Sequence, residues 1–302
     1  MRRTRSRIVT VTLGIMLGTG ISFGEARCQE RPLKIYISVD MEGISGIGTA
    51  KMTSVSGKDY EVGRRLMTAD VMAVVAAILE GRGSAEFLVN DSHGDMQNLL
   101  HTELGPGVQY IQGNTKPLGM VEGLDETFDA AIFVGYHARA GTENAFIAHT
   151  GSGSVKGLWI NGVEVGEGGL NAYYAGAHGV PVIMATGDSA FTVQISQLLD
   201  TRTVVTKVAV GSLVARLYHP NLVHAAIRMT ILEALANLSA ASPLVTQDPV
   251  TVRMRFATTT RPDILQAVPG MRRVDGYTVE YDAADMVEAY KLIRLMYKYI
   301  SW

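Results

Sequence analysis

The chain has 302 residues, enough for one large domain or two ordinary ones. Lysine and arginine number 27 and aspartate and glutamate 29, so the formal net charge is −2 and no basic excess is present to neutralise phosphates. This argues against a nucleic-acid-binding protein. A hydrophobic fraction of 47% excludes a mainly disordered chain, and the single cysteine, Cys28, excludes an intramolecular disulfide framework.

Residues 1–26 have the pattern of a secretory signal peptide. Four arginines between residues 2 and 7 precede an apolar, uncharged stretch from Ile8 to Phe23. Gly24 and Ala26 supply the small residues of a cleavage site after Ala26. The alternative is an uncleaved anchor, but the apolar stretch is shorter than the roughly 20 residues that span a bilayer. We therefore expect export to the periplasm or the medium, with no stable membrane insertion after cleavage.

Short apolar runs rich in β-branched residues predict buried strands that alternate with helices. The predicted strands are residues 33–39, 86–90, 130–135 and 181–186. The predicted helices are 59–79, 167–177 and 188–199, the last with Asp188 as its N-cap. Such alternation indicates a mostly parallel sheet sandwiched by helices. We assign residues 33–200 to this α/β domain.

The pattern changes after residue 200. The predicted elements there are a helix at 220–238, strands at 250–256 and 277–281, and a final helix with Asp282 as its N-cap. Residues 250–256 alternate strictly between apolar and polar, which is typical of a half-exposed strand. The predicted fold class is therefore α/β, with a smaller C-terminal α+β domain over residues 201–302.

Carboxylates and histidines follow several of the predicted strands. Asp40 and Glu42 come directly after the first strand, His93 just past the second, and His137 just past a later one. Glu167 lies near the start of a predicted helix. In open α/β sheets, ligands bind outside the carboxyl ends of the strands. Carboxylates and imidazoles are the usual ligands of zinc or a similar divalent ion, so the five residues together predict a metal site, although each alone is more often an ordinary loop residue.

The remaining histidines divide into two kinds. His149 closes another apolar run, FIAHT, and is a further candidate for the site. The others we interpret as hydrogen-bonded residues outside the site, because three of the four lie in or beside predicted helices without an acidic partner nearby in the sequence. These are His101, His178, His219 and His224.

Six sequence blocks resemble the DppA-type zinc D-aminopeptidases and occur in the same order. They are SVDMEGISG (38–46), NDSH (90–93), KPLGMVEGLDETFDAAIFVGYHARAGT (116–142), AHT (148–150), GEGGLNAY (166–173) and DMVEAY (285–290). Together they extend over the chain that remains after the leader. Six blocks in order are a far more specific signal than any one of them.

The resemblance implies a binuclear site with two Zn²⁺ ions per chain. Asp40 would be a ligand that bridges them, with Glu42 beside it, and His93, His137 and Glu167 would complete the ligand set. His149 would be the catalytic residue, as base, oxyanion stabiliser or nucleophile. The family acts on short peptides with an N-terminal D-residue, D-Ala-D-Ala among them, and its members form ring-like homo-oligomers. This chain departs from it in having a leader, whereas familiar members are cytoplasmic, and in a loop before His149 that is one residue longer.

Two hypotheses follow from these observations. The first is an exported zinc metallopeptidase that hydrolyses the N-terminal residue of short, D-amino-acid-containing peptides by a metal-activated water. The alternative is an exported solute- or metal-binding protein with the same α/β architecture. The five ligand-type side chains favour the enzyme, because a solute-binding protein needs aromatic and arginine contacts instead.

Overall fold

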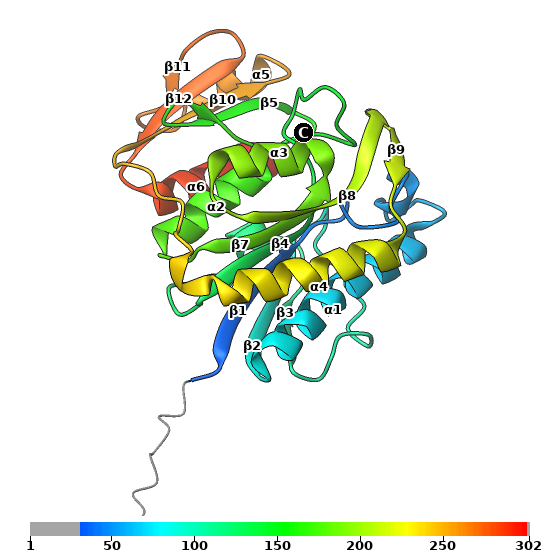
Figure 1. Ribbon diagram of the computed structural model, residues 1–302. Helices are drawn as coiled ribbons and strands as arrows, with labels where there is room; N and C mark the ends of the chain where they lie inside the picture. Colours follow the sequence, from blue (N-terminus) through cyan, green and yellow to red (C-terminus); the bar gives the residue numbers. More distant parts are fainter. Residues whose placement is uncertain (1–30, 301–302) are drawn as a thin grey trace, which may run out of the picture. The chain divides into compact units, whose positions relative to one another are not determined.

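A seven-stranded sheet forms the centre of residues 31–300, the part of the chain that the computed structural model describes (Figure 1). The predicted signal peptide and Cys28 lie outside the described residues. The strand order is β3–β2–β1–β4–β7–β8–β9, and neighbours are parallel except in the β8–β9 hairpin. The strands are β1 (Leu33–Val39), β2 (Ala85–Asp91), β3 (Val108–Ile111), β4 (Ala130–Tyr136), β7 (Val182–Asp188), β8 (Arg202–Gly211) and β9 (Val214–Leu217).

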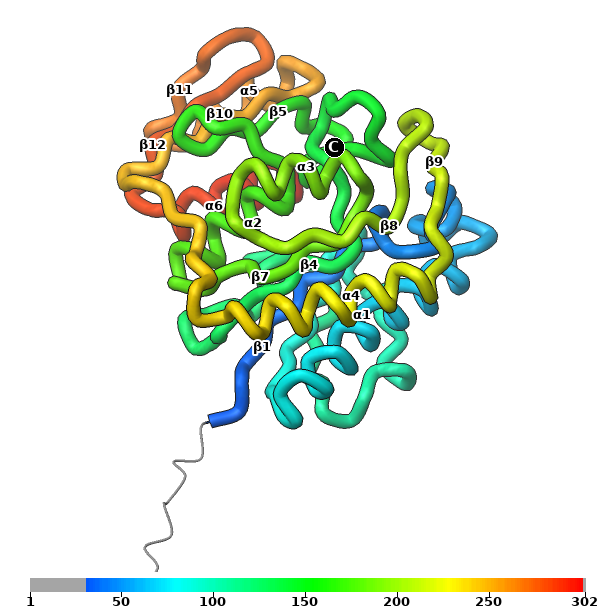
Figure 2. Tube along the Cα trace, viewed as in Figure 1, coloured from blue at the N-terminus to red at the C-terminus, as the bar shows by residue number. Residues whose placement is uncertain are grey.

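Helices cover both faces of this sheet (Figures 1 and 2). One face carries α1 (Tyr60–Arg82) and α4 (Pro220–Ala236), and the other carries α2 (Glu167–Ala177) and α3 (Ser189–Leu198). The side chains of β1 alternate between the two layers: Ile35 and Ile37 pack with the α1 side and Tyr36 with the α2 side. A strand that is buried on both faces explains the continuous apolar run that predicted it.

A second, five-stranded sheet is antiparallel throughout its described strands, in the order β11–β12–β10–β5–β6. Its strands are β5 (Val155–Ile160), β6 (Val163–Glu164), β10 (Val250–Phe256), β11 (Arg272–Arg273) and β12 (Thr278–Ala283). The short helix α5 (Thr260–Leu265) packs on β12, and α6 (Met286–Arg294) packs on β10 and α2. Short helical turns lie at Ala50–Met52, Gly119–Val121 and Leu238–Ala240, and a π-helical turn, Leu295–Tyr299, follows α6.

The predicted fold class is confirmed, because a mostly parallel sheet lies between helices and a smaller α+β part carries the second sheet. Residue 200, however, is not where the two sheets divide. β8 and β9 follow it and extend the first sheet, whereas β5 precedes it and pairs with β10. Alternation of apolar and polar residues within a strand indicates which side chains are buried, but it does not show which other strand pairs with it. None of the described helices is both long enough and apolar enough to cross a bilayer.

Of the two aspartates predicted to be helix N-caps, one is an N-cap in the structure and the other is not. Asp188 caps α3 as expected, because its side chain accepts a hydrogen bond from the Phe191 amide at 2.7 Å. The predicted cap of the last helix, Asp282, is wrong: it lies inside β12, and Asp285 caps α6 by accepting from the Glu288 amide at 2.8 Å. Both aspartates precede the same apolar stripe, so the end of the strand decides which of them is the cap.

A chain of buried hydrogen bonds joins α6, which packs on the second sheet, to α2 and the central sheet. The Tyr290 hydroxyl on α6 donates to Asn171 Oδ1 on α2 at 2.8 Å, and Asn171 Nδ2 donates to the Tyr136 hydroxyl on β4 at 3.0 Å. That hydroxyl lies 2.6 Å from Ser38 Oγ on β1. Polar groups in a core are stabilising when all of them have partners, so this network fixes α6 against the central sheet.

Replacement of Tyr290 by phenylalanine tests the network. Tyr290→Phe keeps the ring and leaves the buried Asn171 Oδ1 without its donor, so the free energy of unfolding should fall by about 1–3 kcal/mol. Urea unfolding measures the change, with Tyr277→Phe, whose ring is 43% exposed, as the matched control. Equal stabilities of the two variants would contradict a stabilising role for the network.

Candidate metal centre

A tight turn after β1 carries Asp40 and Glu42 to the carboxyl end of the sheet. Gly43 closes it against β4, since its amide donates to the Gly135 carbonyl at 2.7 Å and a Cβ at this position would collide with the Tyr136 carbonyl oxygen. Only glycine permits such a close approach of two backbones. The glycine after Glu42 therefore brings both carboxylates over the end of the neighbouring strand.

Two buried ionisable side chains hydrogen-bond to this turn and the residues after it. Asp70 on α1 accepts from the amide and the hydroxyl of Ser45 at 2.9 and 2.6 Å. Lys207 on β8 donates to the carbonyl oxygens of Glu42 and Ile47. His224 is a hydrogen-bonded residue outside the site, as interpreted from the sequence, and its partner is Asp70, whose Oδ1 lies 2.7 Å from His224 Nε2. The His224–Asp70 pair forms where α1 packs on α4. The two residues are far apart in the sequence, so the sequence alone did not indicate that they pair.

The structure brings all the predicted site residues together in two groups. Within each group the candidate ligand atoms lie within 4.8 Å of one another, and the groups are Asp40, Glu42 and His93, and His137, His149 and Glu167. Asp40 contacts both groups: its Oδ1 lies 3.2 Å from His93 Nδ1 and its Oδ2 lies 3.3 Å from His137 Nε2. A carboxylate with one oxygen toward each group has the geometry of a bridging ligand.

Backbone carbonyls orient His93 and His137. His93 Nε2 lies 2.7 Å from the Thr53 carbonyl oxygen, and His137 Nδ1 lies 2.9 Å from that of Ala138. A ring nitrogen that donates to a carbonyl leaves the other nitrogen with a free electron pair. His93 therefore presents Nδ1, and His137 Nε2, to the carboxylates.

Unpartnered buried atoms show that these residues fit a metal. Asp40 Oδ2 and His137 Nε2 are buried and lack a hydrogen-bond partner among the described residues. Asp40, Glu42 and Glu167 are also at most 5% exposed, and burying carboxylates so close together is costly without a counter-charge. A divalent cation between the two groups would satisfy both the free atoms and the excess negative charge.

The carboxylates differ in their electrostatic surroundings. Burial and the charge of Glu42 raise the pKa of Asp40 to about 7. Burial also raises the pKa of Glu167, but His137 and His149 outweigh it and lower that pKa to about 2. In the absence of a cation, Asp40 is thus the carboxyl group that loses its proton less easily than Glu167. This is expected because Asp40 contacts both groups of ligand-type side chains.

His149 occupies a more open position than the other candidates. Its ring stacks on His137 with centroids 4.0 Å apart, and its side chain is 29% exposed against 1% for His137. Its Nδ1 lies 2.9 Å from the Ile147 carbonyl oxygen, which leaves Nε2 free, 3.6 Å from Glu167 Oε1. Ile147 has a φ of +50°, a strained value for a β-branched residue. The strained turn presents His149 both to Glu167 and to the cleft.

Glycines on either side of Glu167 allow the start of α2 to pack closely against Arg139 and Phe191. A Cβ at Gly166 would lie 2.8 Å from Arg139 Cβ, and one at Gly168 would lie 2.6 Å from the ring of Phe191. Glu167 Oε1 also accepts from the Gly151 amide at 2.5 Å. These close contacts explain the GEGG motif, because they let Glu167 reach His137.

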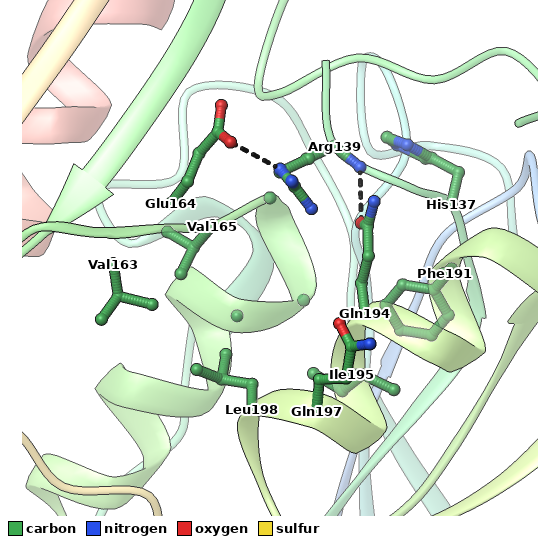
Figure 3. Close-up of a pocket in the computed structure, with 13 residues that line it drawn as sticks. His137, Arg139, Val163, Glu164, Val165, Phe191, Gln194, Ile195, Gln197 and Leu198 are labelled. Carbon is green, nitrogen blue, oxygen red and sulfur yellow. Dashed lines mark hydrogen bonds and ion pairs between the residues drawn. The ribbon is translucent and has the colours of Figure 1, made fainter. Parts of the chain in front are cut away.

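A cavity of about 210 Å³ lies beside this helix start (Figure 3). His137 and Arg139 both line it; the Nε of Arg139 pairs with Glu164 at 3.1 Å and its amide donates to Gln194 at 3.1 Å (Figure 3). Phe191 also lines it. The cavity adjoins the site through His137.

The cleft over the two groups holds about 140 Å³ and has a second wall that sequence analysis missed. Asp40, His93, His149 and Glu167 line one part of it. The end of the chain contributes Arg294, Tyr297 and Lys298. In the sequence, these lining residues could have been suspected from the group of cations and aromatics at the end of the last predicted helix. Cations are also common at ordinary helix C-termini, so this pattern alone does not indicate a site.

Comparisons with known proteins define the class. The chain matches the D-aminopeptidase family, Peptidase_M55, over residues 33–295, and it therefore belongs to that family. It is 38% identical over 269 residues to a D-aminopeptidase of Bacillus subtilis (strain 168), over 87% of this chain and 96% of that protein. A solved structure described as the Zn-dependent D-aminopeptidase DppA from Bacillus subtilis, a self-compartmentalizing protease, matches with a TM-score of 0.84 at 36% identity, over 87% of this chain and 96% of that one. The resemblance predicted from the sequence blocks is confirmed.

Lys207 predicts a pH dependence of stability. Burial lowers its pKa to about 7, although Asp70 and Asp188 oppose the shift. An unfolded lysine keeps its proton up to about pH 10.4, so between the two values the unfolded chain binds a proton that the folded chain lacks. The contribution of Lys207 to the free energy of unfolding should therefore rise with pH from 7 to 9, by up to about 1.4 kcal/mol per unit.

Urea unfolding at pH 7, 8 and 9 measures this slope on chelator-treated protein, so that pH-dependent metal binding does not contribute. The slope should be smaller in Lys207→Met, which cannot titrate. Equal slopes in the two proteins would mean that Lys207 stays charged in the fold.

Proposed function

We propose that this chain is an exported, zinc-dependent D-aminopeptidase that removes the N-terminal residue of short peptides of the D-Ala-D-Ala type. The observation that carries the proposal is Asp40, whose two carboxylate oxygens contact the two groups of ligand-type side chains. Family membership and the Zn-dependent Bacillus subtilis relative support zinc and favour an enzyme over a solute- or metal-binding protein.

The residues divide into two sets around Asp40. Asp40, Glu42 and His93 would hold one ion, and Asp40, His137 and Glu167 the other. Two zinc ions, when bound, supply Lewis acidity that polarises a peptide carbonyl and lowers the pKa of a water toward about 7. The protein contributes the fixed orientation of the imidazoles, through the carbonyls of Thr53 and Ala138.

His149 is the residue that we assign to proton transfer. Its Nδ1 is engaged by the Ile147 carbonyl, and its Nε2 faces the cleft beside Glu167. In this role Nε2 takes a proton from the attacking water and returns it to the amine of the leaving residue. Its partial exposure suits such a role, since the proton must pass between solvent, substrate and ring.

A ring-like homo-oligomer is part of the same proposal. The relative of known structure is described as self-compartmentalizing. In this chain the β8–β9 hairpin and the start of α4 expose apolar side chains, including Val210 (68%), Leu213 (63%) and Leu222 (66%). Contiguous exposed apolar groups of this kind mark protein–protein contacts.

Export rests on the leader alone. If residues 1–26 are a cleaved signal peptide, N-terminal sequencing of protein recovered from the periplasm or the medium should begin at Arg27. Soluble protein that still begins at Met1 would contradict cleavage. The catalytic proposal does not depend on this result.

The activity itself is tested by hydrolysis of D-alanyl-D-alanine before and after chelation. Purified protein should contain close to two zinc ions per chain, lose turnover on chelation and regain it with added zinc. L-alanyl-L-alanine is the matched control for stereochemistry. A chain that hydrolyses neither peptide when loaded with zinc would contradict the proposed function.

Three variants separate the ligands from the catalytic residue. Asp40→Ala should lose both ions, because one carboxylate contacts both groups, and His137→Ala should lose zinc together with rate. His149→Ala should keep its zinc while turnover falls by roughly 10²–10⁴, the usual effect of removing a general acid–base group. Elemental analysis and turnover are measured side by side. Loss of zinc in His149→Ala would make it a ligand, and an unchanged rate would remove it from the mechanism.

A further inference from the structure

The cleft that Asp40 and Glu167 line also carries positive charge that the metal chemistry does not use. Arg294 is the last residue of α6, and Lys298 follows one turn later in the π-helical segment Leu295–Tyr299. Both line the same cleft as Asp40, His149 and Glu167. π-Helical turns are rare and recur at functional sites, because the extra residue redirects side chains.

Arg294 is a buried cation whose hydrogen-bond partners are uncharged. It is 2% exposed, and it donates to the Tyr297 hydroxyl at 2.7 Å and to the Lys116 carbonyl oxygen at 3.2 Å. Its Nε is buried and has no hydrogen-bond partner within residues 31–300. Neither partner neutralises the guanidinium, and a buried charge without a counter-ion is costly. Such a residue at the edge of a cleft is poised for an anionic ligand.

Lys298 extends the positive wall toward the metal groups. Its Nζ donates to the carbonyl oxygen of Gly94, the residue next to His93, at 3.3 Å. Asp95 is the acidic neighbour whose charge acts on Lys298, while Arg294 adds positive charge from the other side. Lys298 thus lines the cleft near His93, and its ammonium is held by a weak contact with an uncharged group that a ligand can replace.

We propose that Arg294 and Lys298 form a subsite for the free C-terminal carboxylate of the peptide substrate. This inference rests on the proposed function, because it assigns a binding site to the part of the peptide substrate that lies beyond the scissile bond. A zwitterionic peptide matches the cleft, with its reacting end over the carboxylate and imidazole groups and its carboxylate at the cationic wall. A guanidinium and an ammonium bind a carboxylate by charge-assisted hydrogen bonds, which an amide cannot replace.

The experiment compares D-alanyl-D-alanine with its C-terminal amide on the zinc-loaded protein. The wild type should prefer the free acid in kcat/KM, and Lys298→Met should lower kcat/KM for the acid by about ten- to hundredfold, the effect of losing one hydrogen bond to a charged group. The loss should appear in KM, since the carboxylate does not react, and the amide should change little. Lys291→Met, an exposed lysine on α6, is the matched control and should behave as the wild type.

Binding to zinc-free protein gives a second measurement that needs no turnover. Calorimetric titration should show the acid binding more tightly than the amide, with the difference lost in Lys298→Met and reduced in Arg294→Lys, which keeps the charge but not the planar fork. If the zinc-loaded wild type cleaves acid and amide equally, the subsite is refuted and the proposed function stands. If it cleaves neither, the proposed function fails, and the titration alone decides the subsite: equal binding, or none, overturns it.

Discussion

The burial of three carboxylates within reach of one another is the constraint on which the rest of the site depends. Asp40, Glu42 and Glu167 would repel one another in a dry environment, and Asp40 shows the cost in a pKa raised to about 7. Imidazoles compensate part of the charge, and the free atoms of Asp40 and His137 leave room for cations to compensate the rest. The structure opposes the repulsion with close packing, of Gly43 against the backbone of β4 and of Gly168 against the ring of Phe191.

Much of this site could be predicted from the sequence because its geometry is a property of parallel sheets. Strands β1, β2 and β4 are neighbours, so Asp40, His93 and His137 at their carboxyl ends must lie along one edge. The apolar runs located those ends to within about a residue. Glu167 does not follow a strand of the central sheet; it was singled out by its place near a helix start and by the resemblance of its block GEGGLNAY to the D-aminopeptidases.

What the sequence could not predict depends on partners distant in the chain. The runs at 155–160 and 202–211 were not predicted as strands, and local alternation could not show that the first joins β10 and the second joins β7. The pairing of His224 with Asp70 and the burial of Lys207 under Glu42 are likewise tertiary events. Arg294 resembled an ordinary helix-terminal cation until its burial beside the cleft was known.

The two walls of the cleft belong to different layers, and one polar network holds them together. α2 begins with Glu167, and Asn171 lies one turn further along this helix. The side chain of Asn171 accepts a hydrogen bond from Tyr290 on α6, and α6 ends at Arg294. The spacing between the carboxylate wall and the cationic wall is therefore fixed by close-packed helices rather than by a mobile loop. A cleft with a fixed spacing and about 140 Å³ of room fits a ligand with charges at its two ends and little between them. The same packing that holds α6 on α2 thus also fixes the position of Arg294 relative to Glu167, on which the proposed carboxylate subsite depends.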